Sequence, residues 1–144
     1  MIVSQILKSK ADIGVISVTA DASVSEAVGI LSEKRIGTVV VSEDGASLDG
    51  ILSERDIVRE MGKRGVACLA EPVSAIMTAK LVTCSPEDTA DKVLEMMTIG
   101  RFRHLPVMDN GAMVGLISIG DVVKARLSEL SMEKDALQGM IMGH

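Results

Sequence analysis

Residues 50–56, GILSERD, recur later in the chain as residues 115–121, GLISIGD. The sequence around this doubled motif repeats with it, because residues 16–45 align with residues 82–111 without a gap. The short segment Val3–Leu7 also recurs, as Val73–Met77. Each copy is therefore about 65 to 70 residues long, which places the chain among internally repeated architectures.

A unit of that size buries only about 60% of its unfolded surface and is marginal alone, so we expect the two copies to pack as one domain. The chain has 144 residues, 47% of them hydrophobic and 1% aromatic, and aliphatic side chains with ten methionines must fill its core. The sequence predicts a first repeat over residues 1–66, a second over 67–130 and a helical tail over 131–144. Gly62–Pro72 is expected to link the copies.

Periodicity and turn residues predict the same elements in each copy. Apolar residues spaced i, i+3, i+4, i+7 predict helices over 24–31 and 90–97, capped by Ser23 and Thr89. Apolar runs on either side of an Asp-Gly or Asn-Gly turn predict hairpins over 38–52 and 104–117. Short leading strands are expected at 13–18 and 81–84, and second helices beginning at Ser53 and Ser118. The prediction is an α/β (α+β) chain made of two β-α-β-β-α repeats.

Composition excludes several function classes. The net charge of −5 and pI near 5.0 leave no broad basic face for nucleic acid. No apolar run reaches 18 residues and Met1–Lys10 lacks signal-peptide blocks, so neither a membrane span nor secretion is expected. Two cysteines without partner spacing fit a reducing compartment and indicate no metal site. We therefore expect a cytoplasmic protein.

The doubled Gly-apolar-apolar-Ser-x-x-Asp motif, the capped helix before each hairpin and the strand FRHLPV at residues 102–107 resemble the cystathionine β-synthase (CBS) domain pair, or Bateman module. The resemblance covers nearly the whole chain and identifies it as a stand-alone small CBS-domain protein. It implies a pseudo-two-fold pair with two clefts between the repeats. In the family these clefts commonly hold adenosine-containing ligands, and two pairs usually form a disc of four repeats, so a homodimer is expected.

The motif residues suit such a ligand chemically. An ionised Asp accepts hydrogen bonds at both oxygens, so Asp56 and Asp121 are candidates for a ribose diol. Ser53 and Ser118 lie at predicted helix starts, where backbone N–H groups favour phosphate. Backbone groups of the leading strands are the adenine candidates: Ile16, Ser17, Val18, Thr19, Val82, Thr83, Cys84 and Ser85. From the resemblance, the basic phosphate candidates are Arg103 and His104, then Arg35, Arg101 and Arg55.

Other interpretations of the same residues stay open. Ser-x-x-Asp ahead of a helix is also a capping box, in which the carboxylate returns to the N-cap amide. An apolar stripe in the tail, Val123, Leu127, Leu130, Leu137 and Ile141, could bury against a second subunit or against the chain's own sheet, which favours a structural or assembly protein without a ligand. The sequence contains no catalytic motif and only one internal histidine, which argues against an enzyme.

The sequence thus predicts a regulatory sensor that binds an adenine nucleotide and signals to a separate, unidentified protein. AMP or NAD(H) is expected ahead of ATP, ADP or S-adenosylmethionine, because one helix end and few basic residues suit one or two phosphates rather than three. No metal is expected as a cofactor.

Overall fold

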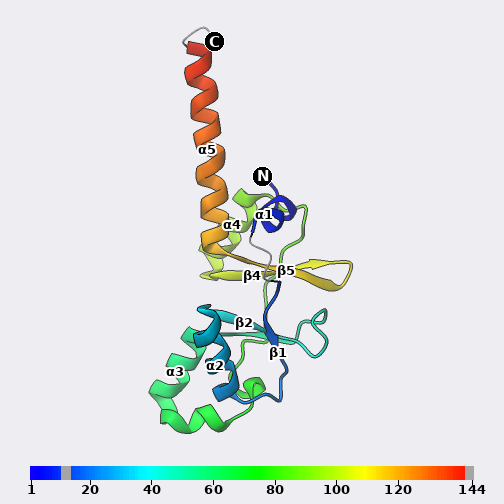
Figure 1. The fold of residues 1–144 in the computed structure, drawn as a ribbon, viewed down its shortest axis with the longest axis vertical. Helices are drawn as coiled ribbons and strands as arrows, with labels where there is room; N and C mark the ends of the chain where they lie inside the picture. Colours follow the sequence, from blue (N-terminus) through cyan, green and yellow to red (C-terminus); the bar gives the residue numbers. More distant parts are fainter. Residues whose placement is uncertain (11–13, 142–144) are drawn as a thin grey trace. The chain divides into compact units, whose positions relative to one another are not determined.

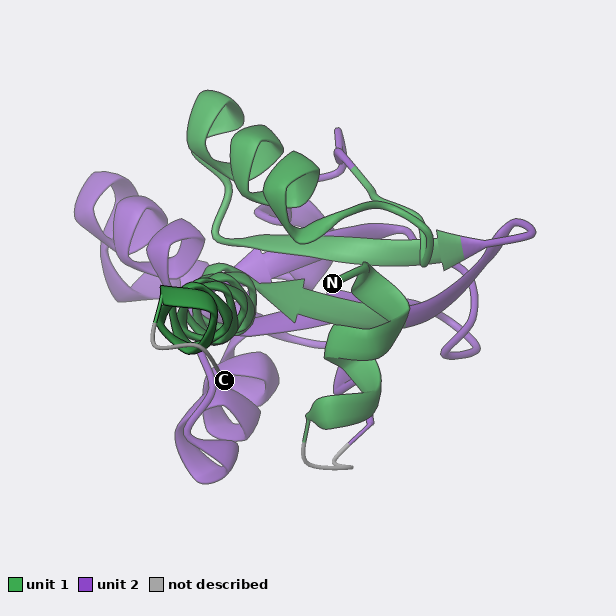
Figure 2. Cartoon of the chain, turned by 90° about the horizontal axis from the view of Figure 1, so that it is seen from above, with its two compact units in different colours: residues 1–12, 83–108, 115–144 green, residues 13–82, 109–114 purple. Residues whose placement is uncertain are grey.

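The computed structural model describes residues 1–10 and 14–141 of the chain (Figure 1). These residues cluster into two compact units, coloured separately in Figure 2. Unit 1 comprises Met1–Asp12, Thr83–Met108 and Gly115–His144, and unit 2 comprises Ile13–Val82 and Asp109–Val114. The units therefore divide the chain differently from consecutive repeats, because the N-terminal segment belongs with the second repeat.

Unit 2 contains a three-stranded sheet of order β1-β2-β3. The strands are β1 (Ser17–Val18), β2 (Thr38–Val41) and β3 (Gly50–Ser53), with β1 parallel and β3 antiparallel to β2. Helices α2 (Val24–Lys34) and α3 (Glu54–Arg64) complete the repeat. Helix α2 begins where predicted, since the Ser23 hydroxyl accepts a hydrogen bond from the Glu26 amide at 3.1 Å.

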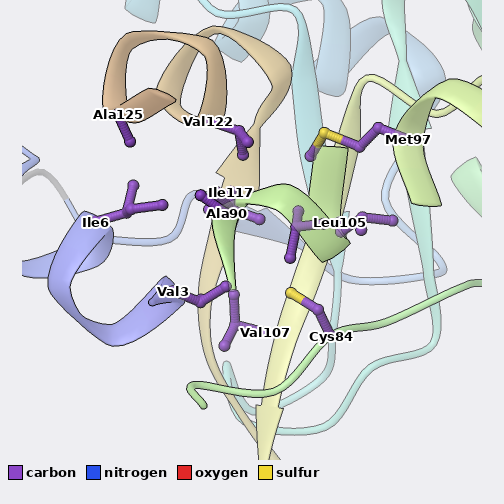
Figure 3. Close-up of a cluster of buried hydrophobic side chains, with 11 residues drawn as sticks. Val3, Ile6, Cys84, Ala90, Met97, Leu105, Val107, Ile117, Val122 and Ala125 are labelled. Carbon is purple, nitrogen blue, oxygen red and sulfur yellow. The ribbon is translucent and has the colours of Figure 1, made fainter. Parts of the chain in front are cut away.

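Unit 1 contains most of the hairpin of β4 (His104–Asp109) and β5 (Ala112–Ser118), whose tip is counted with unit 2, and helices α1 (Val3–Ser9), α4 (Ala90–Gly100) and α5 (Ile119–Ile141). Asn110 and Gly111 both have positive φ, 51° and 80°, as a tight hairpin turn requires. Its core joins side chains from the three helices and both strands around Leu105 and Ile117 (Figure 3). Two residues of that core, Val3 and Ile6, come from α1.

The two leading segments of the repeats are exchanged. Val3 and Ile6 precede the first repeat but pack into the core with elements of the second. Their counterparts Val73 and Ile76 precede the second repeat, yet they pack into the core of unit 2 with α2, β2 and β3. Both contacts bury these side chains almost completely, so each repeat folds around a segment supplied by the other.

The structure corrects the predicted leading strands and adds detail to the expected linker and tail. The leading strands are shorter than expected: only Ser17–Val18 forms a strand, the segment 81–84 contributes a single bridge from Cys84 to Val107, and Ile13 lies outside the described residues. The expected linker is helical, because α3 continues to Arg64 and 3-10 helices η1 (Gly65–Ala70) and η2 (Val73–Ala75) follow. The described part of the predicted helical tail is the end of α5, which runs unbroken to Ile141, and residues 142–144 are not described.

Candidate functional site

In the first repeat, the motif Asp56 forms a capping box at the start of α3. Its Oδ2 accepts hydrogen bonds from the Ser53 amide at 3.0 Å and the Ser53 hydroxyl at 3.1 Å, and the Asp56 amide donates back to that hydroxyl at 3.3 Å. Its Oδ1 accepts from the Arg59 guanidinium at 2.8 Å and, at 3.4 Å, from the Thr78 hydroxyl. The side chain is 8% exposed. Asp56 is thus a buried carboxylate with donors on both oxygens.

In the second repeat, Asp121 caps α5 in the same way but has a different second partner. Its Oδ2 accepts from the Ser118 amide at 2.9 Å, and the Asp121 amide donates to the Ser118 hydroxyl at 3.1 Å. The same Oδ2 lies 2.8 Å from the Lys10 ammonium. Desolvation raises the pKa of Asp121, but hydrogen bonds from Lys10 and Ser118 outweigh it and lower the pKa overall. Asp121 therefore carries its charge at neutral pH.

Both carboxylates realise the capping interpretation of the motif. This cap leaves their ligand role open, because a carboxylate can cap a helix with one oxygen and accept a hydroxyl with the other. Among the described residues, Oδ1 of Asp121 has no hydrogen-bond partner, and its side chain is 22% exposed. Of the two motif carboxylates, Asp121 is the one with an oxygen left for a ligand.

The basic candidates occupy four kinds of position. Arg35 and Arg101 follow α2 and α4 as left-handed C-caps, with φ of 55° and 57°, a conformation that favours glycine. Both side chains are exposed, as are those of Arg55 in the first turn of α3 and Arg103 before β4. The Arg103 carbonyl accepts from the Ile119 amide at 2.8 Å, which holds Arg103 at the N-terminus of α5. His104 is half-buried on β4.

The leading segments direct different backbone groups toward their neighbouring strands. The carbonyl of Ile16 accepts from β2 and that of Val18 from Ser42 just after it, and both backbone groups of Cys84 bond to β4, so none of these is available to an adenine. The parallel register turns the intervening backbone groups of Ser17 and its counterpart Thr83 away from those strands. The Ser85 amide is held by the Asp88 carboxylate. Thr19, Val82 and Thr83 are exposed.

Three residues at the motif were absent from the sequence prediction: Arg59, Thr78 and Lys10. Arg59 lies one helical turn after Asp56, so i,i+3 spacing is a signal that could have found it. Thr78 and Lys10 come from the exchanged leading segments. Nothing in the local sequence indicates that Lys10 contacts the motif of the other repeat.

Residues 1–10 and 14–141 contain no cluster of His, Cys, Asp and Glu that could hold a metal ion. Burial, with a contribution from the Asp88 carboxylate, raises the pKa of the Cys84 thiol to about 11, so this thiol is neutral at physiological pH. None of the helices described is both long and apolar enough to cross a bilayer.

Comparison with known proteins assigns the family. The model of the CBS domain matches residues 4–63 and 73–128, and the chain belongs to this family. It is 36% identical over 148 residues to CBSX3, a mitochondrial protein of Arabidopsis thaliana, covering 98% of this chain and 72% of that protein. It spans only 23% of CBSCBSPB2 from the same plant, at 30% identity.

Solved structures show the same fold. ATU1752 from Agrobacterium tumefaciens is 44% identical with a TM-score of 0.82, over 88% of this chain and 99% of that one. Two more distant structures hold ligands. CBSX2, solved in complex with AMP, is 24% identical with a TM-score of 0.73, over 88% of this chain and 96% of its own. The CBS pair of MJ0100, in complex with 5′-methylthioadenosine and S-adenosylmethionine, is 23% identical with a TM-score of 0.76, over 90% of this chain and 98% of that one.

Proposed function

We propose that this CBS pair is a regulatory module that binds an adenine nucleotide, AMP ahead of NAD(H), and reports its presence to a separate protein in the cytoplasm. The observation that carries the proposal is the second motif, where an ionised carboxylate with one unengaged oxygen lies at the N-terminus of a long helix. A free carboxylate oxygen accepts hydrogen bonds from hydroxyl groups, and a helix N-terminus favours phosphate groups. The AMP bound by CBSX2 supports adenine nucleotides as the class.

The second repeat supplies a group for each part of the nucleotide. Asp121 accepts from the ribose hydroxyls, and the backbone of Thr83 meets the edge of the adenine. The phosphate lies at the α5 N-terminus near Ser118, with Arg103 and His104 as its basic partners. In the first repeat Asp56, Ser53 and Ser17 hold the corresponding positions, and Arg35, Arg55 and, after α4 of the second repeat, Arg101 are further phosphate candidates.

Calorimetric titration of nucleotide-free protein with AMP, and then with NAD and ATP, tests the proposal. Asp121→Ala should weaken AMP binding by about 30- to 1000-fold, as expected for losing one or two charge-assisted hydrogen bonds. Asp135→Ala removes the same charge from an exposed position on α5 and serves as the matched control. Absence of binding heat with all three nucleotides at several temperatures would contradict the proposal.

A second candidate function is assembly through α5 without a ligand. The apolar stripe of the tail does not cover the chain's own sheet. Its exposed side chains are Val123, Leu127, Leu130, Leu137 and Ile141, from 40% to 84% accessible. Their alternating spacing of three and four residues, interrupted at Lys134, is that of a helix seam. A second copy of α5 offers the same seam, so a homodimer buries it.

The assembly candidate is tested by light scattering after gel filtration. Leu130→Glu with Leu137→Glu should convert a dimer to a monomer, because each charge would lie within the seam. Ser131→Glu adds a charge at an exposed position outside the seam and should leave the dimer intact. A wild-type chain that stays monomeric at all concentrations tested would contradict this candidate.

A further inference from the structure

The Lys10 ammonium is bound directly at the motif of the second repeat. It lies 2.8 Å from Oδ2 of Asp121 and donates to the Leu116 carbonyl at 3.0 Å. Both side chains of this ion pair are partly exposed, 32% for Lys10 and 22% for Asp121. Lys10 follows α1, whose position in unit 1 is set by the buried Val3 and Ile6. The contact is therefore built into the exchanged N-terminal segment rather than made by a loose surface side chain.

This contact restricts what Asp121 can accept. A ribose diol presents two hydroxyl donors, which a carboxylate binds best with both of its oxygens. Oδ2 already accepts from the Ser118 amide and from Lys10, whereas Oδ1 has no partner among the described residues. One hydroxyl can bind at Oδ1 directly. The second hydroxyl has to compete with the Lys10 ammonium at Oδ2.

Once displaced from Asp121, the Lys10 ammonium has a second possible partner nearby, the phosphate of the ligand. Lys10 Nζ and the Ser118 amide bind the same oxygen of Asp121, so they are separated by no more than two hydrogen-bond lengths. The proposed phosphate position at the α5 N-terminus is thus within the reach of a flexible lysine stem. A lysine acts there as a mobile point charge, which suits a partner that changes when the ligand arrives.

We propose that Lys10 is a specificity-determining residue of the second-repeat site: it occupies Asp121 when the site is empty and transfers to the ligand phosphate when a nucleotide binds. The inference rests on the proposed nucleotide function. With Lys10 in this role the site distinguishes nucleotides from nucleosides, because adenosine must break the Lys10–Asp121 ion pair without offering the ammonium a phosphate. AMP breaks the same ion pair, but its phosphate gives the Lys10 ammonium a new partner.

The test compares AMP with adenosine by calorimetric titration of wild type and Lys10→Met. Removing Lys10 should strengthen adenosine binding by about two- to fivefold, the cost of displacing a partly exposed ion pair. It should weaken AMP binding by about tenfold or more, because one charge-assisted contact to the phosphate is lost. Lys8→Met, at an exposed position in the last turn of α1, is the matched control. Thermal unfolding of each variant checks that α1 remains docked.

The possible outcomes separate this inference from the proposed function. Opposite shifts for adenosine and AMP in Lys10→Met, with Lys8→Met unchanged, support the role of Lys10. Wild-type affinity of Lys10→Met for both ligands, while wild type itself binds AMP, overturns only the role of Lys10. Absence of binding in wild type and Lys10→Met alike overturns both proposals. If Lys10→Met binds adenosine and wild type does not, Lys10 is the group that blocks the empty site.

Discussion

At the scale of single residues, the two motif carboxylates differ in how fully their oxygens are engaged. Asp56 is buried and engaged on both oxygens, whereas Asp121 keeps one oxygen unengaged. The same sequence position therefore supports stability in the first repeat and is available to a ligand in the second. The residues that make this difference are Arg59 and Thr78 on one side and Lys10 on the other.

Asp56→Ala should lower the free energy of unfolding by about 2–3 kcal/mol, since it removes a helix cap and leaves the Arg59 and Ser53 donors without their acceptor. Asp121→Ala, which loses a cap at a more exposed site, should cost about 1 kcal/mol. Urea denaturation of the two variants measures the difference. Equal costs would show that the buried contacts of Asp56 contribute no more than the cap itself.

The lowered pKa of Asp121 gives a pH prediction. Because its folded pKa lies below the ordinary value of 3.8 for an aspartate, the carboxylate stabilises the folded state above about pH 4, and this contribution is lost as the pH falls through the folded pKa. Lys10→Met should move the pKa of Asp121 upward, as it removes a hydrogen bond and a positive charge. Carboxyl NMR titration of both proteins reports the pKa directly. An unchanged pKa would mean that the Ser118 hydrogen bonds alone maintain it.

Arg101 holds a left-handed C-cap in which glycine has no steric penalty. Arg101→Gly should therefore raise the free energy of unfolding by up to about 1 kcal/mol. Arg101→Ala keeps the strained backbone and removes the same charge, which separates the two effects. If Arg101 also contacts the phosphate, both variants should bind AMP more weakly than wild type does. A glycine variant no more stable than the alanine variant would show that the cap is unstrained.

At the scale of elements, the motif glycines explain how the exchanged segments fit. A Cβ on Gly50 would lie 2.8 Å from the Met77 sulfur and 2.9 Å from the Thr78 carbonyl, and one on Gly115 would lie 2.9 Å from Leu7. Met77 and Leu7 are corresponding residues of the repeats. The glycine that opens each motif is therefore required because the leading segment supplied by the other repeat packs directly against β3 or β5.

Gly115→Ala should destabilise the chain by about 1–3 kcal/mol through overpacking against Leu7. In a Leu7→Ala background the same change should cost less, because the obstructing side chain is gone. A double-mutant cycle by denaturation measures this coupling. Gly139→Ala is the control, since its Cβ would meet no neighbour within 4 Å. Additive costs would contradict the direct contact between β5 and the N-terminal segment.

Elements with a local signal were predictable from the sequence, and those that depend on distant pairing were not. The helices have their N-caps at Ser23, Thr89 and Ser53 as predicted, because capping and periodicity are properties of adjacent residues. The second leading strand was wrong because one bridge to Val107 is its only pairing among the described residues. The capping box was predicted as an alternative, whereas Lys10 was missed because the exchange that brings it to Asp121 leaves no local trace in the sequence.

At the scale of the whole molecule, two similar repeats differ in what surrounds their motif carboxylates. The sequence assigns both motifs the same residues at the strand-to-helix junction, yet Asp56 accepts from four donors and is 8% exposed. A ribose at Asp56 would have to displace Arg59 and Thr78 from a buried carboxylate. At Asp121 it would displace only a partly exposed lysine.

We therefore expect about one AMP per chain, bound in the second repeat, because only Asp121 has an oxygen available without breaking a buried network. Calorimetry with protein of known active fraction gives the stoichiometry. Asp56→Asn should bind AMP as wild type does although it unfolds more easily, whereas Asp121→Asn should lose binding and unfold nearly as wild type. Two equivalent sites, or loss of AMP binding in Asp56→Asn, would mean that the Arg59 and Thr78 contacts open for a ligand. The carboxylate of the first repeat would then be a second receptor for the nucleotide rather than a structural cap.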